Sequence, residues 1–230
     1  MSGPIQSGVP ANIAWFQENH HYAEAQARLE CYQNIRRSVE HEIRGVEALL
    51  DVGNGGFFNY DTSLANHVTV VDLFLPDGPG PDPNTVYRRG SVLELPFAGE
   101  SFDCVLAQNL LHHVTGRTAR ENHANLDAAL GEMYRCLRAG GKAVLIESTV
   151  NAAFHGFECL VFRSARRITI GGHPMTFQFT PGHVIRSGLA VGFRLEEVAY
   201  VPRGRWVLQF GYRWPSLLTP ARPIKLVLTR

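Results

Sequence analysis

The chain has 230 residues, of which 45% are hydrophobic and 19% charged, proportions typical of a globular protein with one domain. Its 22 basic and 21 acidic residues leave a net charge of +1, and its arginines are spread along the chain, which argues against a dedicated nucleic-acid-binding function. No run of about 18 apolar residues predicts a membrane span, and the first residues lack the basic flank and apolar run of a signal peptide, so we expect a cytoplasmic protein.

The first 45 residues predict a helical cap. Residues 11–22 are aromatic and are expected to be helical. Apolar side chains then recur at steps of three and four from Leu29 to Ile43, ahead of Gly45. This spacing is typical of an amphipathic helix that ends at a glycine.

Five short apolar runs between residues 46 and 150 predict buried strands. They are residues 46–51, the part of HVTVVDLF that ends at Asp72, and residues 85–88, 104–109 and 142–147. A helix with apolar residues from Leu126 to Leu137 is predicted to end at Gly140 and Gly141. The proline-rich stretch LPDGPGPDPN predicts a loop where a crossover helix is expected. Alternating strands and helices favour parallel βαβ units in a doubly wound sheet.

The last 80 residues predict an insertion followed by a helix and two strands. Residues 151–180 begin with the apolar stretch AAFHGFECLVF and lie directly after a strand, so we expect them to form a lid. Pro181 is expected to start a short helix, and residues 195–201 and 224–229 to form the last strands. The connection between these strands holds arginines among aromatic side chains, which is more typical of an amphipathic edge than of an anion clamp.

The block LLDVGNGG places Asp51 and three glycines where the first strand ends. Glycines allow a ligand to approach the backbone closely. The block lacks the dinucleotide pattern G-x-G-x-x-G, and the charge of Asp51 would repel a pyrophosphate, so it favours a ligand with a cationic head. Asp72, at the end of the second strand, is placed to accept hydrogen bonds from a ribose. A cation joined to a ribose describes S-adenosylmethionine.

Four segments in order resemble the class I S-adenosylmethionine-dependent methyltransferases: LLDVGNGG, VVDLF, GSVLELPFAGESFDCVLAQNLLHHV and EMYRCLRAGGKAVLIES. The resemblance covers most of residues 46–147. It implies one α/β domain with a Rossmann-like, doubly wound sheet of seven strands whose last strand is reversed. The expected parts are the cap at 1–45, a cofactor-binding core at 46–150, the lid at 151–180, and the final helix and strands at 181–230.

The resemblance also implies which residues bind the cofactor. The implied contacts are Asp51, Gly53, Asn54 and Gly55 around the methionine part, Asp72 at the ribose, Leu73, Ser91 and Val92 around the adenine, and Gln108, Asn109 and Leu110 beneath the sulfonium. Phe57 departs from the family pattern because it replaces the third glycine. Ser91 stands where the family commonly has an acid for the adenine amino group.

Two histidines are the candidate catalytic residues. His113 follows the fourth strand, at a turn that faces the methyl group in this resemblance, and an imidazole with a pKa of about 6.5 can accept a proton there. The alternative is that His113 or its neighbour His112 only lines the pocket. His155 lies three residues before Glu158 in the insertion, where the pair would orient an apolar acceptor under the lid. The alternative is a helix that covers the sheet and leaves both side chains solvated.

The spacing of the ten histidines predicts no metal site. His20–His21 and His112–His113 are adjacent pairs, and no H-x-x-x-H pattern with an acid occurs. The fourth strand ends in Gln108 and Asn109 rather than in acids. The four cysteines are scattered without a CxxC pair, which is typical of reduced thiols.

The sequence therefore predicts methyl transfer from S-adenosylmethionine to an oxygen, nitrogen or activated carbon of a small, partly apolar or aromatic metabolite. We expect neither a nucleic acid nor a membrane as partner, and a homodimer is left open. Two alternatives stay open as well. One is a protein of this fold that binds the cofactor and catalyses another reaction or none, and the other is a methyltransferase that acts on protein or RNA.

Overall fold

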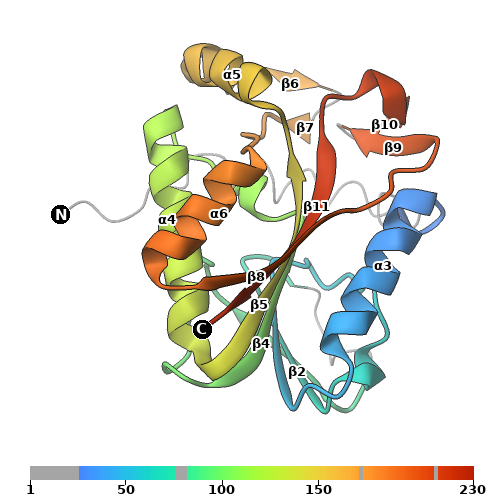
Figure 1. Cartoon of the computed structure of the whole chain (residues 1–230), viewed down its shortest axis with the longest axis vertical. Helices are drawn as coiled ribbons and strands as arrows, with labels where there is room; N and C mark the ends of the chain where they lie inside the picture. The colour runs from blue at the N-terminus through green and yellow to red at the C-terminus, as the bar shows by residue number, and fades with distance from the viewer. Residues whose placement is uncertain (1–25, 76–81, 171–172, 210–211) are drawn as a thin grey trace.

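The computed structural model of the chain describes residues 26–75, 82–170, 173–209 and 212–230 (Figure 1). The helix expected at residues 11–22 lies outside these ranges. So does most of the proline-rich loop. No helix within the described ranges is long and apolar enough to cross a membrane.

A sheet of seven strands forms the centre of the molecule, in the order β3-β2-β1-β4-β5-β11-β8. The strands are β1 (Ala48–Val52), β2 (His67–Asp72), β3 (Thr85–Arg89), β4 (Phe102–Gln108), β5 (Leu137–Thr149), β8 (Arg194–Tyr200) and β11 (Arg222–Thr229). Strands β1 to β5 pair in parallel, whereas β11 is antiparallel to both of its neighbours, β5 and β8. The predicted doubly wound sheet with a reversed last strand is thus confirmed.

Helices cover the two faces of the sheet (Figure 1). Helices α4 (Ala119–Cys136) and α6 (Pro181–Val191) lie on one face, and α3 (Glu30–Ile43) lies on the other. The predicted stripe of α3 is buried, because Ile35, Val39 and Ile43 join an apolar cluster with residues of β1, β2, β4 and β5. At the start of α4, the Thr118 hydroxyl accepts a hydrogen bond from the backbone N–H of Glu121, which satisfies one of the free donors of the first turn.

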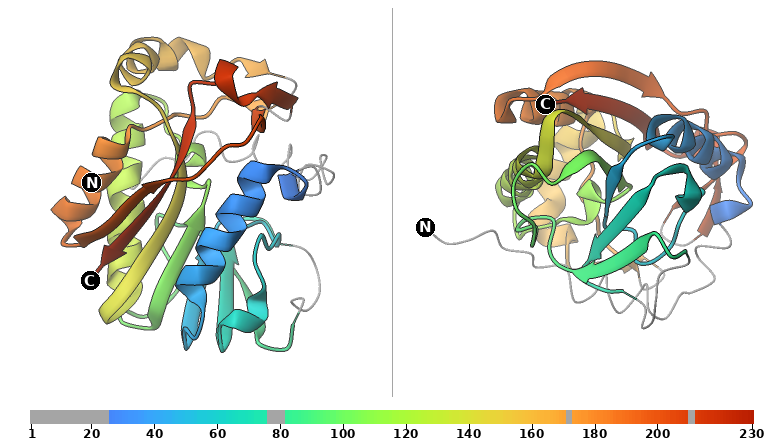
Figure 2. Two further views of the ribbon diagram at one scale, coloured as in Figure 1. Left: turned by 45° about the vertical axis from the view of Figure 1, so that its right-hand side comes forward. Right: turned by 90° about the horizontal axis from the view of Figure 1, so that it is seen from below.

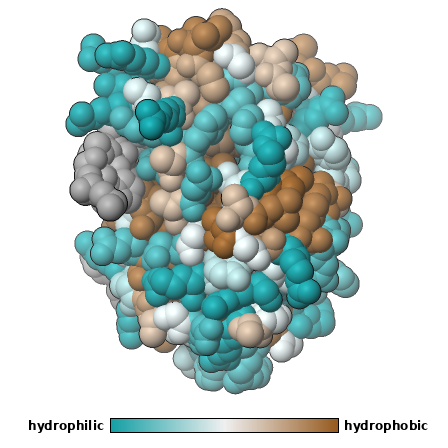
Figure 3. Space-filling model, turned by 60° about the vertical axis from the view of Figure 1, so that its left-hand side comes forward, coloured by the Kyte–Doolittle hydropathy of each residue, from teal (hydrophilic) through white to brown (hydrophobic). Residues whose placement is uncertain are grey.

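Several short elements gather above the carboxyl ends of the parallel strands (Figures 1 and 2). They are α5 (Ala152–Ala165), the strand pair β6 (Thr169–Ile170) and β7 (His173–Pro174), the hairpin β9 (Trp206–Gln209) and β10 (Tyr212–Pro215), and the 3-10 turns η2 (Leu111–His113) and η3 (Ser216–Leu218). Figure 3 shows apolar side chains at the top of the molecule, at the height of α5. Phe157 and Leu160 of α5 are exposed there. Ligands of open parallel sheets bind at this edge, so these elements surround the expected site.

One local expectation was wrong, and two further features were not predicted. Helix α4 ends at Cys136 rather than at the two glycines, which lie inside β5 because Gly140 and Gly141 pair with the backbone of Arg230 next to β11. The arginine-rich connection between the last two strands contains the hairpin β9–β10. Between β1 and β2 the chain forms only the 3-10 turn η1 (Thr62–Leu64), and helix α3, from before β1, covers that face instead.

Candidate active site

A cavity of about 680 Å³ opens at the carboxyl edge of the sheet. One part of its lining, which we term the loop wall, consists of lining residues between 52 and 110, from the loop after β1 and the ends of β2 and β4. A second part, the lid wall, consists of lining residues between 154 and 223, from α5, residues 173–178, β9 and residues 219–223. Residues of helix α3 and the turn η2, together with Gln26, Val114, Ser148 and Val150, complete the lining. The volume falls within the usual range of ligand pockets, about 300 to 1,000 Å³.

The loop after β1 adopts backbone angles that favour glycine at three positions. Gly53, Gly55 and Gly56 have φ values of +77°, +61° and +83°, in the left-handed region that other residues rarely adopt. A Cβ atom on Gly53 would lie 2.4 Å from Cδ1 of Leu110. The loop therefore brings backbone to the cavity at a point where a side chain has no room.

Asp51 lies beneath this loop and is fully buried. Its Oδ2 accepts hydrogen bonds from the Asn54 side-chain amide at 2.6 Å and the Tyr60 hydroxyl at 2.7 Å. Its Oδ1 is buried and has no hydrogen-bond donor among the described residues. Burial raises the pKa of Asp51 to about 7, and the charge of Asp72 acts in the same direction. A cationic donor next to Oδ1 would both satisfy this oxygen and favour the ionised form.

Asp72 fastens the loop to the end of β2. Its Oδ2 accepts from the backbone N–H of Gly55 at 2.8 Å, and its Oδ1 accepts from that of Phe74 at 2.9 Å. Burial nevertheless raises the pKa of Asp72 above its ordinary value. Asp72 lines the cavity, and each carboxylate oxygen can accept more than one hydrogen bond, so the group can also receive two hydroxyl donors.

The end of β4 closes the loop wall. Asn109 has a φ of +51°, rare for a residue other than glycine, and its backbone N–H donates to the carbonyl of Ile146 at 2.7 Å. This turn directs the Leu110 side chain against Gly53. Gln108 lines the cavity, and its Oε1 is buried without a donor among the described residues.

His112 is held in place by Glu147, a pairing that was not predicted. Glu147 is buried at the end of β5, and its Oε2 accepts from the backbone N–H of Leu111 at 2.7 Å. Its Oε1 is hydrogen-bonded to Nδ1 of His112 and accepts from the backbone N–H of Ser148. Both oxygens of Glu147 accept backbone hydrogen bonds, so Nδ1 of His112 is the donor in this pair and Nε2 takes no part in it. His112 lines the cavity, so this imidazole is oriented for proton transfer.

His113 lies beside His112 and also lines the cavity. Its ring centre is 4.3 Å from that of His112 and 5.6 Å from that of His173. Burial lowers the pKa of His113 well below its ordinary value, and the two neighbouring histidines lower it further. His113 is therefore neutral at pH 7, but it is a weaker base than a solvated histidine.

Helix α5 presents different residues to the cavity than the sequence predicted. Phe154 and Glu158 line the cavity, whereas Phe157 is 60% exposed and His155 is not part of the lining. Nδ1 of His155 lies 2.7 Å from the carbonyl oxygen of Gln178, and its ring faces α4 and α6. His155 and Glu158 lie only about 60° apart around the helix, since three residues turn it by about 300°, and both contact the backbone of Gln178, but only Glu158 also lines the cavity.

Glu158 is the titratable group that α5 brings to the lid wall. Its Oε2 accepts from the backbone N–H of Gln178 at 2.9 Å. Burial raises the pKa of Glu158 to about 7. A carboxyl group in this state can donate or accept a proton near neutrality.

Most of the residues proposed for the cofactor share the loop wall. Those that line the cavity are Gly53, Asn54, Gly55, Asp72, Leu73, Val92, Gln108, Asn109 and Leu110. Asp51 lies behind the wall. Ser91 is not part of the lining, and its hydroxyl accepts from the backbone N–H of Leu93.

The loop wall fits S-adenosylmethionine. Asp51 Oδ1 and Gln108 Oε1 are buried and lack hydrogen-bond donors among the described residues. An ammonium group carries three N–H donors and so suits these two oxygens. The space beside the Gly55 backbone is open to a ligand, and the Asp72 carboxylate suits ribose hydroxyls.

Comparison of the sequence with known proteins also finds methyltransferases. Residues 50–145 match the family model of a methyltransferase domain. A stretch of 57 residues is 47% identical to a candidate methyltransferase of Encephalitozoon cuniculi (strain GB-M1), and this match spans about a quarter of each chain.

Solved structures share the fold at low sequence identity. A Burkholderia thailandensis 1,6-didemethyltoxoflavin-N1-methyltransferase, solved with 1,6-didemethyltoxoflavin and S-adenosylhomocysteine, superposes with a TM-score of 0.65 at 16% identity, over 100% of this chain and 91% of that one. A Haloferax volcanii complex of the Trm112 methyltransferase activator with a candidate methyltransferase gives a TM-score of 0.56 at 14% identity, over 99% and 97% of the two chains. This chain therefore contains a methyltransferase domain at residues 50–145, and it shares the fold of these solved methyltransferases.

Proposed function

We propose that this protein transfers the methyl group of S-adenosylmethionine to an oxygen, nitrogen or activated carbon of a small, partly apolar or aromatic metabolite. The observation that carries the proposal is the cavity itself, which extends from the cofactor-fitting loop wall to a lid wall of mixed character. Phe154, Met175 and Val207 give the lid wall apolar surface, and Glu158 gives it a titratable group. A space of this kind suits one small acceptor next to the cofactor.

The proposed chemistry needs alignment first and proton removal second. S-adenosylmethionine supplies a methyl group that is already activated by its bond to a positively charged sulfur. The loop wall would fix the position of that methyl group, and the lid wall would hold the acceptor in line with it, which can account for much of the rate. His112, oriented by Glu147, is the best-placed base for a proton on the acceptor, and His113 is the second candidate.

The test has two steps. Isothermal titration should first give binding of S-adenosylmethionine and S-adenosylhomocysteine to the purified chain. Incubation with a panel of phenols, heteroaromatic amines and carbon acids should then release S-adenosylhomocysteine with one class of acceptor, and His112→Ala should slow this release by about 100-fold or more at unchanged cofactor affinity. Cofactor binding with no release on any panel member would instead favour a binding protein or a different reaction.

A second candidate is a methyltransferase that needs a partner protein. Leu217 and Leu218 of η3 are 92% and 71% exposed, directly before lining residues Thr219 and Pro220. The Haloferax volcanii structure is a complex with an activator protein. Release of S-adenosylhomocysteine by the isolated chain with a small acceptor would exclude this dependence. The homodimer stays a prediction.

A further inference from the structure

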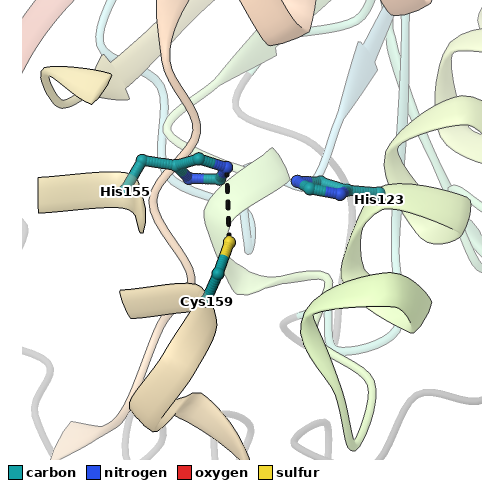
Figure 4. A group of neighbouring side chains, drawn as sticks. All are labelled: His123, His155 and Cys159. Atoms are coloured by element: carbon teal, nitrogen blue, oxygen red, sulfur yellow. Dashed lines mark hydrogen bonds between the residues drawn. The ribbon is translucent and has the colours of Figure 1, made fainter. Parts of the chain in front are cut away.

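A group of histidine and cysteine side chains lies outside the cavity, between α5 and the helices α4 and α6. His123 comes from α4, His155 and Cys159 come from successive turns of α5, and His183 comes from the first turn of α6. The potential ligand atoms of His123, His155 and Cys159 all lie within 4.8 Å of one another. Figure 4 shows the three side chains converging, with the His155 ring directed at the Cys159 sulfur, 3.5 Å away. None of these four residues lines the cavity.

The orientation of the His155 ring is the first sign of a ligand site. Its Nδ1 lies 2.7 Å from the Gln178 carbonyl oxygen, which can only accept, so Nδ1 carries the proton. Nε2 is left with its lone pair directed at the cluster, toward Cys159. Histidines that bind metals are commonly oriented in this way, by a hydrogen bond from the other ring nitrogen to a carbonyl or carboxylate.

A second, independent sign comes from α4. Nε2 of His123 is buried and has no hydrogen-bond partner among the described residues. Its ring centre is 5.3 Å from that of His155.

His183 closes a further side of the group. Its ring centre lies 4.4 Å from that of His155 and 5.0 Å from that of His123. Burial lowers the pKa of His183 to about 4, with His155 and His123 contributing. Its Nδ1 is 2.8 Å from the Thr180 hydroxyl, so its other ring nitrogen is the one available to a metal.

We propose that His123, His155 and Cys159 form a zinc site, with His183 or a water molecule in the fourth position. Imidazole nitrogen and thiolate sulfur are the donors that Zn²⁺ prefers, whereas Mg²⁺ and Ca²⁺ require oxygen ligands. Binding would form one Zn–S bond and two Zn–N bonds, and the proton of the Cys159 thiol would pass to solvent. The site is structural rather than catalytic, because its ligands face away from the cavity.

The consequence of such a site is a fixed position for α5. The helix presents Phe154 and Glu158 to the cavity on one side and His155 and Cys159 to α4 on the other. A metal bound between α5 and α4 would therefore hold the lid wall in place. Zinc binding itself can be measured without cofactor or acceptor, so its test is independent of the proposed reaction.

The experiment is a metal titration of protein that has been stripped with a chelator. We expect one equivalent of Zn²⁺ to bind and to raise the melting temperature, and Co²⁺ in its place to give the absorption band of a cobalt–thiolate bond. Cys159→Ser should abolish that band. Cys159→Ser and His123→Gln should each weaken zinc binding by at least about 100-fold, since even partners that only orient a metal ligand are worth about 10- to 100-fold.

The matched control is His67→Gln, which removes an exposed histidine far from the cluster and should leave zinc binding unchanged. Circular dichroism of each stripped variant shows whether it is folded. Failure of the wild-type chain to bind zinc, or equal binding by the wild type and both cluster variants, would overturn the proposal.

Discussion

At the scale of single residues, two carboxylates at the ends of neighbouring strands have different tasks. Asp51 is buried with one oxygen that lacks a donor, whereas both oxygens of Asp72 already accept backbone hydrogen bonds. Asp51 thus has one carboxylate oxygen that a cationic group can pair with. Asp72 offers an acceptor whose position the glycine loop has already fixed.

Asp72→Asn should weaken S-adenosylmethionine binding by about tenfold to several hundredfold. Charge-assisted hydrogen bonds contribute about 1.5 to 3 kcal/mol each, and the amide also presents its NH₂ to one of the two backbone donors. Isothermal titration measures the affinity, and Asp127→Asn on the exposed surface of α4 is the control. Equal affinities for both variants would remove the ribose assignment.

Cofactor binding should release protons near pH 7. The carboxyl of Asp51 has a pKa of about 7 in the ligand-free protein, so about half of the molecules carry the proton at that pH. An ammonium group next to Oδ1 lowers this pKa and expels the proton. The buffer takes up the released proton, so the apparent binding enthalpy depends on the ionisation enthalpy of the buffer. Calorimetric titrations at pH 7 in two buffers should therefore give binding enthalpies that differ by about half of the difference between the two ionisation enthalpies. Identical enthalpies would contradict the contact between Asp51 and the ammonium.

At the scale of elements, α5 brings Phe154 and Glu158 to the lid wall of the cavity. The helix packs over the carboxyl edge of the sheet, and its residues divide between the cavity, the α4 side and solvent (Figures 1 and 4). Phe154 and Phe157 belong to the same helix, but only Phe154 lines the cavity. These two residues form a matched pair for testing the lid.

Phe154→Ala should reduce kcat/KM for the acceptor by about tenfold or more while changing cofactor affinity little. The reason is that it removes apolar contact area from the lid wall, at about 25 cal/mol for each Å². Phe157→Ala should leave both quantities unchanged, because this side chain is largely in solvent. Steady-state kinetics and calorimetry on both variants provide the comparison. A larger kinetic effect from Phe157→Ala would show that α5 is not the lid described above.

At the scale of the whole molecule, the sheet joins two apolar clusters, one on each face, and the cavity lies at its carboxyl edge. Buried titratable groups at this edge link global stability to pH. Glu158 has a raised pKa of about 7, so the folded state holds its proton more tightly than the unfolded chain does. Its contribution to stability is complete below the ordinary glutamate pKa and is lost as the pH rises to about 7.

Glu158→Gln should therefore become more stable relative to the wild type as the pH rises from 5 to 8. Glutamine keeps an acceptor for the Gln178 backbone N–H and has no charge to bury. Urea unfolding of the ligand-free protein at several pH values measures the difference. Glu196→Gln, on the exposed edge strand β8, is the control. Its free energy of unfolding should differ from that of the wild type by the same amount at every pH. A constant difference for Glu158→Gln as well would show that its carboxyl is not buried in solution.

Sequence alone predicted the sheet and much of the loop wall, because these depend on local signals. Short apolar runs indicate buried strands, and the acids Asp51 and Asp72 directly follow such runs. The position of Gly140 within β5 depends on hydrogen bonds to Arg230, which a local pattern does not contain.

The rest of the site depends on contacts between distant segments. The pairing of His112 with Glu147 joins residues 35 positions apart. Helical spacing places His155 next to Glu158 on α5, but it does not say which of the two lines the cavity. The spacing of His155 and Cys159, four residues apart, places both on one face of α5, but it does not show that His123 of α4 lies opposite them.

The two walls of the cavity come from separate stretches of the chain. The loop wall lies entirely before residue 111, and the lid wall entirely after β5. In evolution, insertions and substitutions after β5 can therefore change the chemical selectivity of the enzyme without disturbing its use of the methyl donor. The same division makes residues 151–180 a natural unit for exchange between homologues in protein engineering.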